Sequence, residues 1–136
     1  MFRYSSLVLG LILLPTLMVP SAHAADNGFW QNPVIKSAGE MHPLPDAAFQ
    51  PDPQVTYKVV FSITRGENDP KQVNGGLEHV ARAVNVFASA HVPLDHLKFV
   101  VIIHGGAVPM TLDNAHYRKE FKIDNPNLKL IKELKA

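Results

Sequence analysis

The sequence predicts a single α/β domain built on a parallel sheet, and three observations support this prediction. Residues 57–64 (YKVVFSIT) are β-branched and aromatic, as is typical of a strand. Residues 97–103 (LKFVVII) form a second, almost continuously apolar run. Between them, apolar residues recur every three or four positions, which indicates a helix of about five turns. A strand, a helix and a strand in this order form a β-α-β unit with parallel strands.

Length and composition limit what the chain can do. Its 136 residues are enough for one domain and not for two. A formal net charge of +1 gives no electrostatic reason to expect nucleic-acid binding. Because these residues include no cysteine, disulfides, zinc–thiolate sites and thiol chemistry are excluded within them.

Residues 1–24 have the features of a secretory signal peptide. Arg3 precedes an uncharged apolar run, and Ala22 and Ala24 form the small-residue pattern of a cleavage site. The run contains prolines and is shorter than the about 20 residues that span a bilayer. We therefore expect cleavage after Ala24, with no membrane contact afterwards. The lack of cysteine favours a bacterial periplasm over a disulfide-rich extracellular space.

Residues 25–56 are expected to form an extended, proline-rich arm. The prolines are spaced too closely for a helix or a central strand. Phe29, Trp30 and Phe49 are not typical of a free linker, so we expect these aromatic side chains to cover apolar surface of the domain. A mobile tail is the alternative.

The remaining chain, 57–136, is expected to form the α/β domain. Its first helix has two possible starts, one with Asp69 as the N-cap and a later one with Asn74 as the N-cap. The strand 97–103 is expected to be covered on both faces, because continuous apolar runs are typical of such strands. Two more helices are expected over 112–121 and 128–136.

The carboxyl ends of the two strands mark the expected ligand site, because ligands of open parallel sheets bind beyond these ends. The candidate ligand-binding residues follow the strands or begin the first helix: Thr64, Arg65, Asn74, Gly75, His104, Gly105 and Gly106. A cation, a helix N-terminus and a glycine turn together suit a small anion, although glycines also serve turns alone.

His104 is the candidate residue with the widest range of possible chemical roles. An imidazole at a strand end can act as a base or a ligand, but it can equally hold its own turn. Neither an acid nor a nucleophile neighbours it in the sequence, and Ser62 and Ser89 lack the Gly-x-Ser-x-Gly pattern of serine hydrolases. The other histidines lack metal-ligand spacing. We predict no catalytic set, no metal and no cofactor, and leave enzymatic activity open.

Five stretches carry a family resemblance: FWQNPVIKSAGEMHPLPDAAFQPD, YKVVFSIT, VNGGLEHVARAVNVFASAHVP, LKFVVIIHGGAVPMTLDNAHYRKEF and NPNLKLIKELKA. Together they resemble the exported bacterial subgroup of the DsrE/DsrF-like family and cover most of the chain after the signal peptide. The resemblance implies a three-layer, flavodoxin-like α/β fold with a mostly parallel sheet, and the formation of homo-oligomers. In sulfur-oxidising and tRNA-thiolation members, a cysteine carries persulfide sulfur between partners.

The family's sulfur-carrying cysteine has no counterpart in this sequence. Subgroup members continue, after their equivalent of LIKELKA, with a strand carrying a V-C-G-Q-like motif and a further helix. The resemblance therefore implies that 57–136 is a DsrE-like domain that is incomplete at its C-terminal end. Only His104 and Gly105, in the HGGA segment, carry over as site features.

Two functions are compatible with these observations. The first is a small binding or carrier module, related to sulfur metabolism by resemblance, which binds a small anionic or sulfur-containing ligand. The second is a homo-oligomeric structural or interaction subunit, because self-association would cover the open edges of a two-stranded sheet. A truncated product without function is a third possibility.

Overall fold

The computed structural model describes residues 29–136, so the predicted signal peptide, 1–24, lies outside the described residues. The regular elements follow in the order β1 (Tyr57–Ile63), α1 (Gly75–Ser89), β2 (Leu97–Ile103), α2 (Asn114–Phe121) and α3 (Leu128–Leu134). Two short 3-10 helices flank β2, namely η1 (Leu94–His96) and η2 (Gly105–Thr111). Within this range the structure contains no helix with the length and apolar character needed to cross a membrane.

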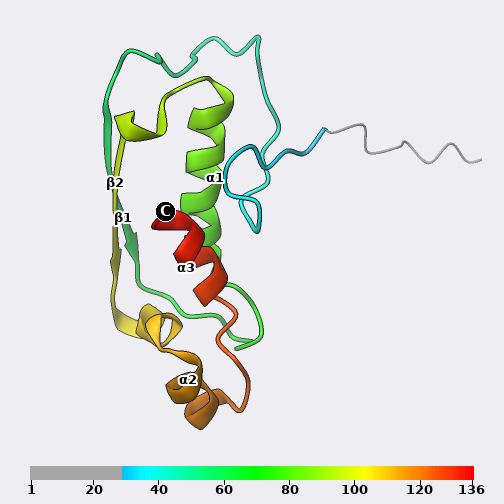
Figure 1. Ribbon diagram of the computed structural model, residues 1–136, viewed down its shortest axis with the longest axis vertical. Coiled ribbons are helices and arrows are strands. Elements are labelled where there is room, and N and C mark those ends of the chain that lie inside the picture. Colours follow the sequence, from blue (N-terminus) through cyan, green and yellow to red (C-terminus); the bar gives the residue numbers. More distant parts are fainter. Residues whose placement is uncertain (1–28) are drawn as a thin grey trace, which may run out of the picture.

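β1 and β2 form a two-stranded parallel sheet, which confirms the predicted β-α-β unit. The register runs from Tyr57 opposite Leu97 to Ile63 opposite Ile103. In Figure 1, α1 and α3 lie on the same side of this sheet. The chain is therefore a mixed α/β protein. Its buried core joins the end of β1 to the inner faces of the two helices and to the arm: Ile35, Ile63, Leu77, Val80, Ala81, Ala107, Met110 and Leu130.

Residues 29–136 leave the other side of the sheet open, so for the described residues the prediction that 97–103 is covered on both faces is wrong. Alternate side chains of both strands are exposed, among them Val60, Val100 and Ile102. Figure 1 places no helix of residues 29–136 on this side. An apolar run shows that both faces of a strand would be stable when buried. It does not show that the chain supplies a second layer of helices to bury them. The described helices that pack on the sheet supply only one such layer.

α1 begins at the later of its two predicted starts. Asn74 has an extended backbone, and its side chain accepts a hydrogen bond from the amide of Gly76, as an N-cap does. Asp69 instead holds a turn, in which its carboxylate accepts from the amide of Lys71. Aspartate caps local turns as readily as it caps helices, so Asp69 alone does not mark a helix start.

The arm is ordered and lies along the side of α1 that faces away from the sheet (Figure 1). Asn85 of α1 anchors it, because its side-chain oxygen accepts from the amides of Val34 and Ile35 at 3.0 and 2.8 Å. The amide nitrogen of Asn85 donates to the carbonyls of Ile35 and Gly39 at 3.1 and 3.0 Å. The backbone of the arm is therefore held by the side chain of one buried residue, Asn85, and not by pairing with a strand of the sheet.

The arm covers the domain with aliphatic side chains and not with its aromatic ones. Ile35 and Met41 are buried, whereas Phe29, Trp30 and Phe49 are exposed, so the predicted aromatic cover is wrong. Ile35 turns inward because Asn85 fixes the backbone on both sides of it. Phe29 stacks on His42 instead, at 3.6 Å between ring centroids.

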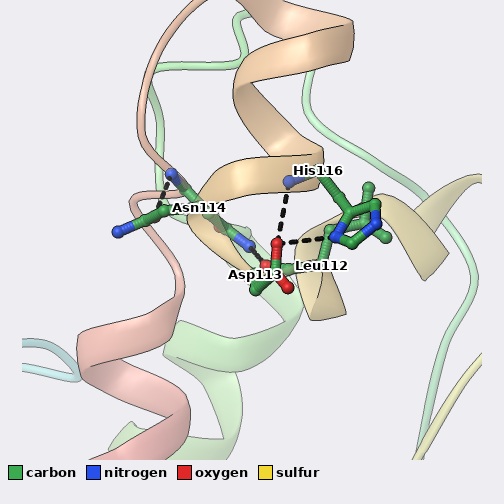
Figure 2. Close-up of polar contacts among 5 residues, drawn as sticks. Leu112, Asp113, Asn114 and His116 are labelled. Carbon is green, nitrogen blue, oxygen red and sulfur yellow. Dashed lines mark hydrogen bonds and ion pairs between the residues drawn. The ribbon is translucent and has the colours of Figure 1, made fainter.

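α2 begins at Asn114, two positions later than predicted, because Asp113 is its N-cap. One carboxylate oxygen of Asp113 accepts from the backbone amide of His116 and also meets His116 Nδ1, both at 2.8 Å. Figure 2 shows this carboxylate between the backbone and the ring of His116. These contacts, the backbone hydrogen bond first, lower the pKa of Asp113 below its ordinary value of 3.8.

Asp113 therefore makes the stability of α2 depend on pH in the acid range. Because its pKa is lower in the folded than in the unfolded chain, the contribution is complete above a pH of about 3.8. It is lost as the pH falls through the lowered folded value. Asp113→Asn, which keeps an oxygen at the cap, should give a flatter curve when thermal unfolding is followed between about pH 5 and pH 2. Parallel curves for the two proteins would contradict this assignment.

Candidate functional site

The carboxyl ends of both strands meet at one edge of the molecule, next to η2 and α2 (Figure 1). The amide of His104 donates to the carbonyl of Ile63 at 3.0 Å, which continues the ladder one step beyond the strands. The loops then touch at Gly66 and Gly106, where a Cβ atom on Gly66 would lie 2.6 Å from the Gly106 oxygen. The structure thus brings the two predicted loops together, and only glycine permits this approach.

His104 forms a side-chain hydrogen bond that the sequence analysis missed. Its Nε2 lies 3.0 Å from Ser62 Oγ, and both residues are exposed. The alternation of the strands would have indicated this pair, because Ser62 is opposite Ile102 and His104 follows two positions later on the same face. No carboxylate of residues 29–136 contacts this imidazole, so the pair lacks the third member of a catalytic triad.

The first amides of α1 are satisfied by groups of the protein itself. Glu67 Oε1 accepts from the amide of Gly75 at 2.8 Å, and Asn74 Oδ1 accepts from the amide of Gly76 at 2.9 Å. The Asn74 side chain also donates to the carbonyl of Arg65 at 2.8 Å. Of the predicted site residues, Asn74 and Gly75 therefore belong to a helix cap, and a carboxylate already occupies the place proposed for an anion.

A pocket of about 200 Å³ lies beside this edge. The loops after both strands and one face of α2 line it, and its side chains include Glu67, Asn68, Gln72, Met110, Tyr117 and Phe121. Among the predicted residues only Asn74 and Gly106 line it, whereas Thr64, Arg65, Gly75, His104 and Gly105 do not. Glu67 is the one charged residue of the lining, so the pocket suits a neutral or cationic group better than an anion.

Tyr117 was not among the predicted site residues, because nothing in the sequence after the second strand indicates that α2 folds back onto this edge. Its hydroxyl donates to the carbonyl of Pro70 at 2.9 Å, which ties α2 to the loop after β1. Burial, followed by the nearby charge of Asp69, raises the pKa of Tyr117 above 10.0. The phenol therefore stays protonated and acts as a hydrogen-bond donor.

Three buried asparagines hold the walls of the pocket together. The Asn125 amide nitrogen donates to the carbonyls of Met110 and Leu112 at 2.8 and 2.6 Å. Its oxygen accepts from Asn127 Nδ2 at 2.9 Å, and Asn127 Oδ1 accepts from the amide of Asn74 at 2.7 Å. This network connects η2, the turn before α3 and the start of α1, and it leaves no buried side-chain polar atom of the described residues unpaired.

The described residues contain no cluster of three or more histidine, aspartate or glutamate side chains arranged to hold a metal ion. A scan against protein-family models, a search of curated proteins and a search of solved structures each gave no match for this chain.

Proposed function

We propose that this protein is a small exported binding module of the DsrE-like type, with its ligand site at the carboxyl edge of the sheet. The observation that carries the proposal is the pocket of about 200 Å³ at this edge, where ligands of parallel sheets bind. The three-layer fold, the periplasmic location and the relation to sulfur metabolism belong to the same proposal. They are supported by the sequence resemblance and by the pattern of residues 1–24.

The proposed ligand is a small anionic or sulfur-containing molecule held by Arg65 and His104 on the loops that follow the two strands. Both side chains are exposed, and neither forms an ion pair with another of the residues from 29 onward. Because Glu67 lines the pocket, the anionic part of the ligand lies outside the pocket, beside Arg65 and His104, and any neutral part lies inside. Arginine suits this role because its guanidinium forms charge-assisted hydrogen bonds to oxyanions.

Titration calorimetry with thiosulfate and with sulfite tests this function. One charge-assisted hydrogen bond contributes about 1.5 to 3 kcal/mol, so Arg65→Ala should weaken binding about 10- to 100-fold. The matched control is Lys71→Ala, which removes another exposed cation six positions further along the same loop. Heat indistinguishable from dilution with both anions would refute the proposal, and equal losses in both variants would reduce it to a general charge effect.

A homo-oligomeric interaction subunit is the second candidate. Both strands of the described sheet are edge strands, and a groove of about 650 Å³ adjoins β2, with Leu94, Leu97 and Phe99 in its lining. Light scattering should show an oligomer that Leu94→Lys dissociates and that the control Val108→Lys, another exposed apolar site, leaves intact. A monomer throughout the accessible concentration range would remove this candidate.

A further inference from the structure

The open side of the sheet carries an ordered pattern of side chains, which we name the outer face. Its members are all exposed and alternate along both strands with residues that are buried or half-buried: Lys58, Val60, Ser62, Lys98, Val100 and Ile102. The register places the two lysines opposite each other, the two valines opposite each other, and Ser62 opposite Ile102. The outer face is therefore cationic where the strands begin, apolar in the middle, and polar where Ser62 meets His104.

Residues 29–136 do not cover the apolar middle of the outer face. Val60, Val100 and Ile102 remain 65%, 54% and 50% exposed, although they are adjacent on two paired strands. Parallel sheets are characteristically covered on both faces, and the covering elements are helices. The hydrophobic effect therefore favours cover on this face, and a helix is the element that usually supplies it in parallel sheets.

The lysines at the start of the two strands favour negative charge on any element that covers this end of the outer face. Lys58 and Lys98 are direct cross-strand partners, and like charges in this position destabilise a sheet. Neither lysine takes part in an ion pair with the described part of the chain, and the outer face contains no acidic residue. A carboxylate from outside would relieve this repulsion, so the surface is complementary to an acidic partner.

We propose that the outer face binds an amphipathic helix of a partner protein, with carboxylates in its last turn lying over Lys58 and Lys98. The partner helix runs antiparallel to the strands, because the negative end of its dipole then faces the lysines. α1 covers the inner face in this same direction (Figure 1). The four steps from Lys58 to Ser62 span about 13 Å, which a helix covers with about nine residues.

A second copy of this chain is a poor occupant of the same face. Two outer faces packed together would bring two lysine pairs into one interface without a single carboxylate. The outer face contains neither Arg65 nor any residue that lines the pocket, and it meets the proposed ligand site only where Ser62 contacts His104. The peptide test is therefore separate from the ligand test, because the peptide's carboxylates lie over Lys58 and Lys98 at the other end of the strands.

Two synthetic helical peptides with the same leucine stripe test the proposal against the full chain. One carries glutamates in its last turn and the other carries lysines there, and fluorescence anisotropy measures their binding. The glutamate peptide should bind about tenfold more tightly or better, and the double substitution Lys58→Glu, Lys98→Glu should reverse the preference. Lys129→Glu with Lys135→Glu, a matched charge reversal on exposed positions of the α3 region, should leave it unchanged.

The exposed position of Val100 allows a second variant that separates binding from folding. Val100→Ser should weaken binding of the glutamate peptide. The circular dichroism spectrum should stay that of the wild type, because the Val100 side chain lies outside the core. Equal affinity for both peptides, or binding unaffected by the lysine reversal, would overturn the proposal. So would lysine-dependent binding to phosphatidylglycerol vesicles without peptide binding, or a dimer that the lysine reversal dissociates.

Discussion

Replacing Asn85 by leucine is expected to lower the free energy of unfolding by about 3 to 5 kcal/mol and to release the arm from α1. Asn85 is 0% exposed, and leucine matches its branching but has no polar atom. The amides of Val34 and Ile35 and the carbonyl of Gly39 would lose their partner. Each buried backbone group left unpaired costs about 1 to 3 kcal/mol. The arm can avoid this cost only by moving into water, which would expose Ile35.

Urea denaturation gives the stability change, and hydrogen exchange at Val34 and Ile35 reports release of the arm. Arg82→Ala is the matched control. It lies on the same helix and also holds the arm, through a hydrogen bond from Arg82 Nε to the Glu40 carbonyl at 2.9 Å. Because Arg82 is exposed, its loss should cost less than about 1 kcal/mol. Equal effects of the two substitutions would show that Asn85 is not the anchor.

Asn125→Leu is expected to cost about 3 kcal/mol and to loosen the pocket at the carboxyl edge. The carbonyls of Met110 and Leu112 would lose their donor, and Asn127 would lose the acceptor that orients its side chain. Since Asn127 in turn holds the amide of Asn74, the start of α1 is affected as well. The effect therefore extends beyond the hydrogen bonds that Asn125 forms directly.

Denaturation measures the loss of stability, and faster hydrogen exchange at the Asn74 amide measures its spread to α1. Asn68→Leu makes the same chemical change in another residue of the pocket lining. Because Asn68 is exposed, its substitution should change stability by less than about 0.5 kcal/mol. Unchanged exchange at Asn74 in Asn125→Leu would contradict the proposed network.

The β-α-β unit could be predicted because its determinants are local. The strand residues alternate or run apolar, and the stripe on α1 recurs at helical spacing, so neither needs knowledge of distant segments. The meeting of the two loops at the carboxyl edge then follows from parallel pairing alone. The candidate residues Thr64, Arg65, His104, Gly105 and Gly106 were found by this rule, and they do lie on those two loops.

The parts that could not be predicted depend on partners far away in the sequence. Asn85 follows Leu77 and Ala81 at intervals of four, so it sits on the apolar stripe of α1, and a polar residue there is a sign of a buried backbone partner. The sequence does not say that this partner is the arm, 50 residues earlier. Tyr117 is likewise held beside the pocket by a distant contact, the hydrogen bond to the carbonyl of Pro70, which lies 47 residues earlier.

The anchoring of the arm by Asn85 also sets an order of events as the chain is made. Val34 emerges first, but its hydrogen-bond acceptor follows 51 residues later. The arm therefore cannot dock until α1 has been synthesised and has coiled, and closing so long a loop carries an entropic cost that is recovered only then. In a nascent chain Ile35 therefore remains accessible to water and to chaperones during this interval.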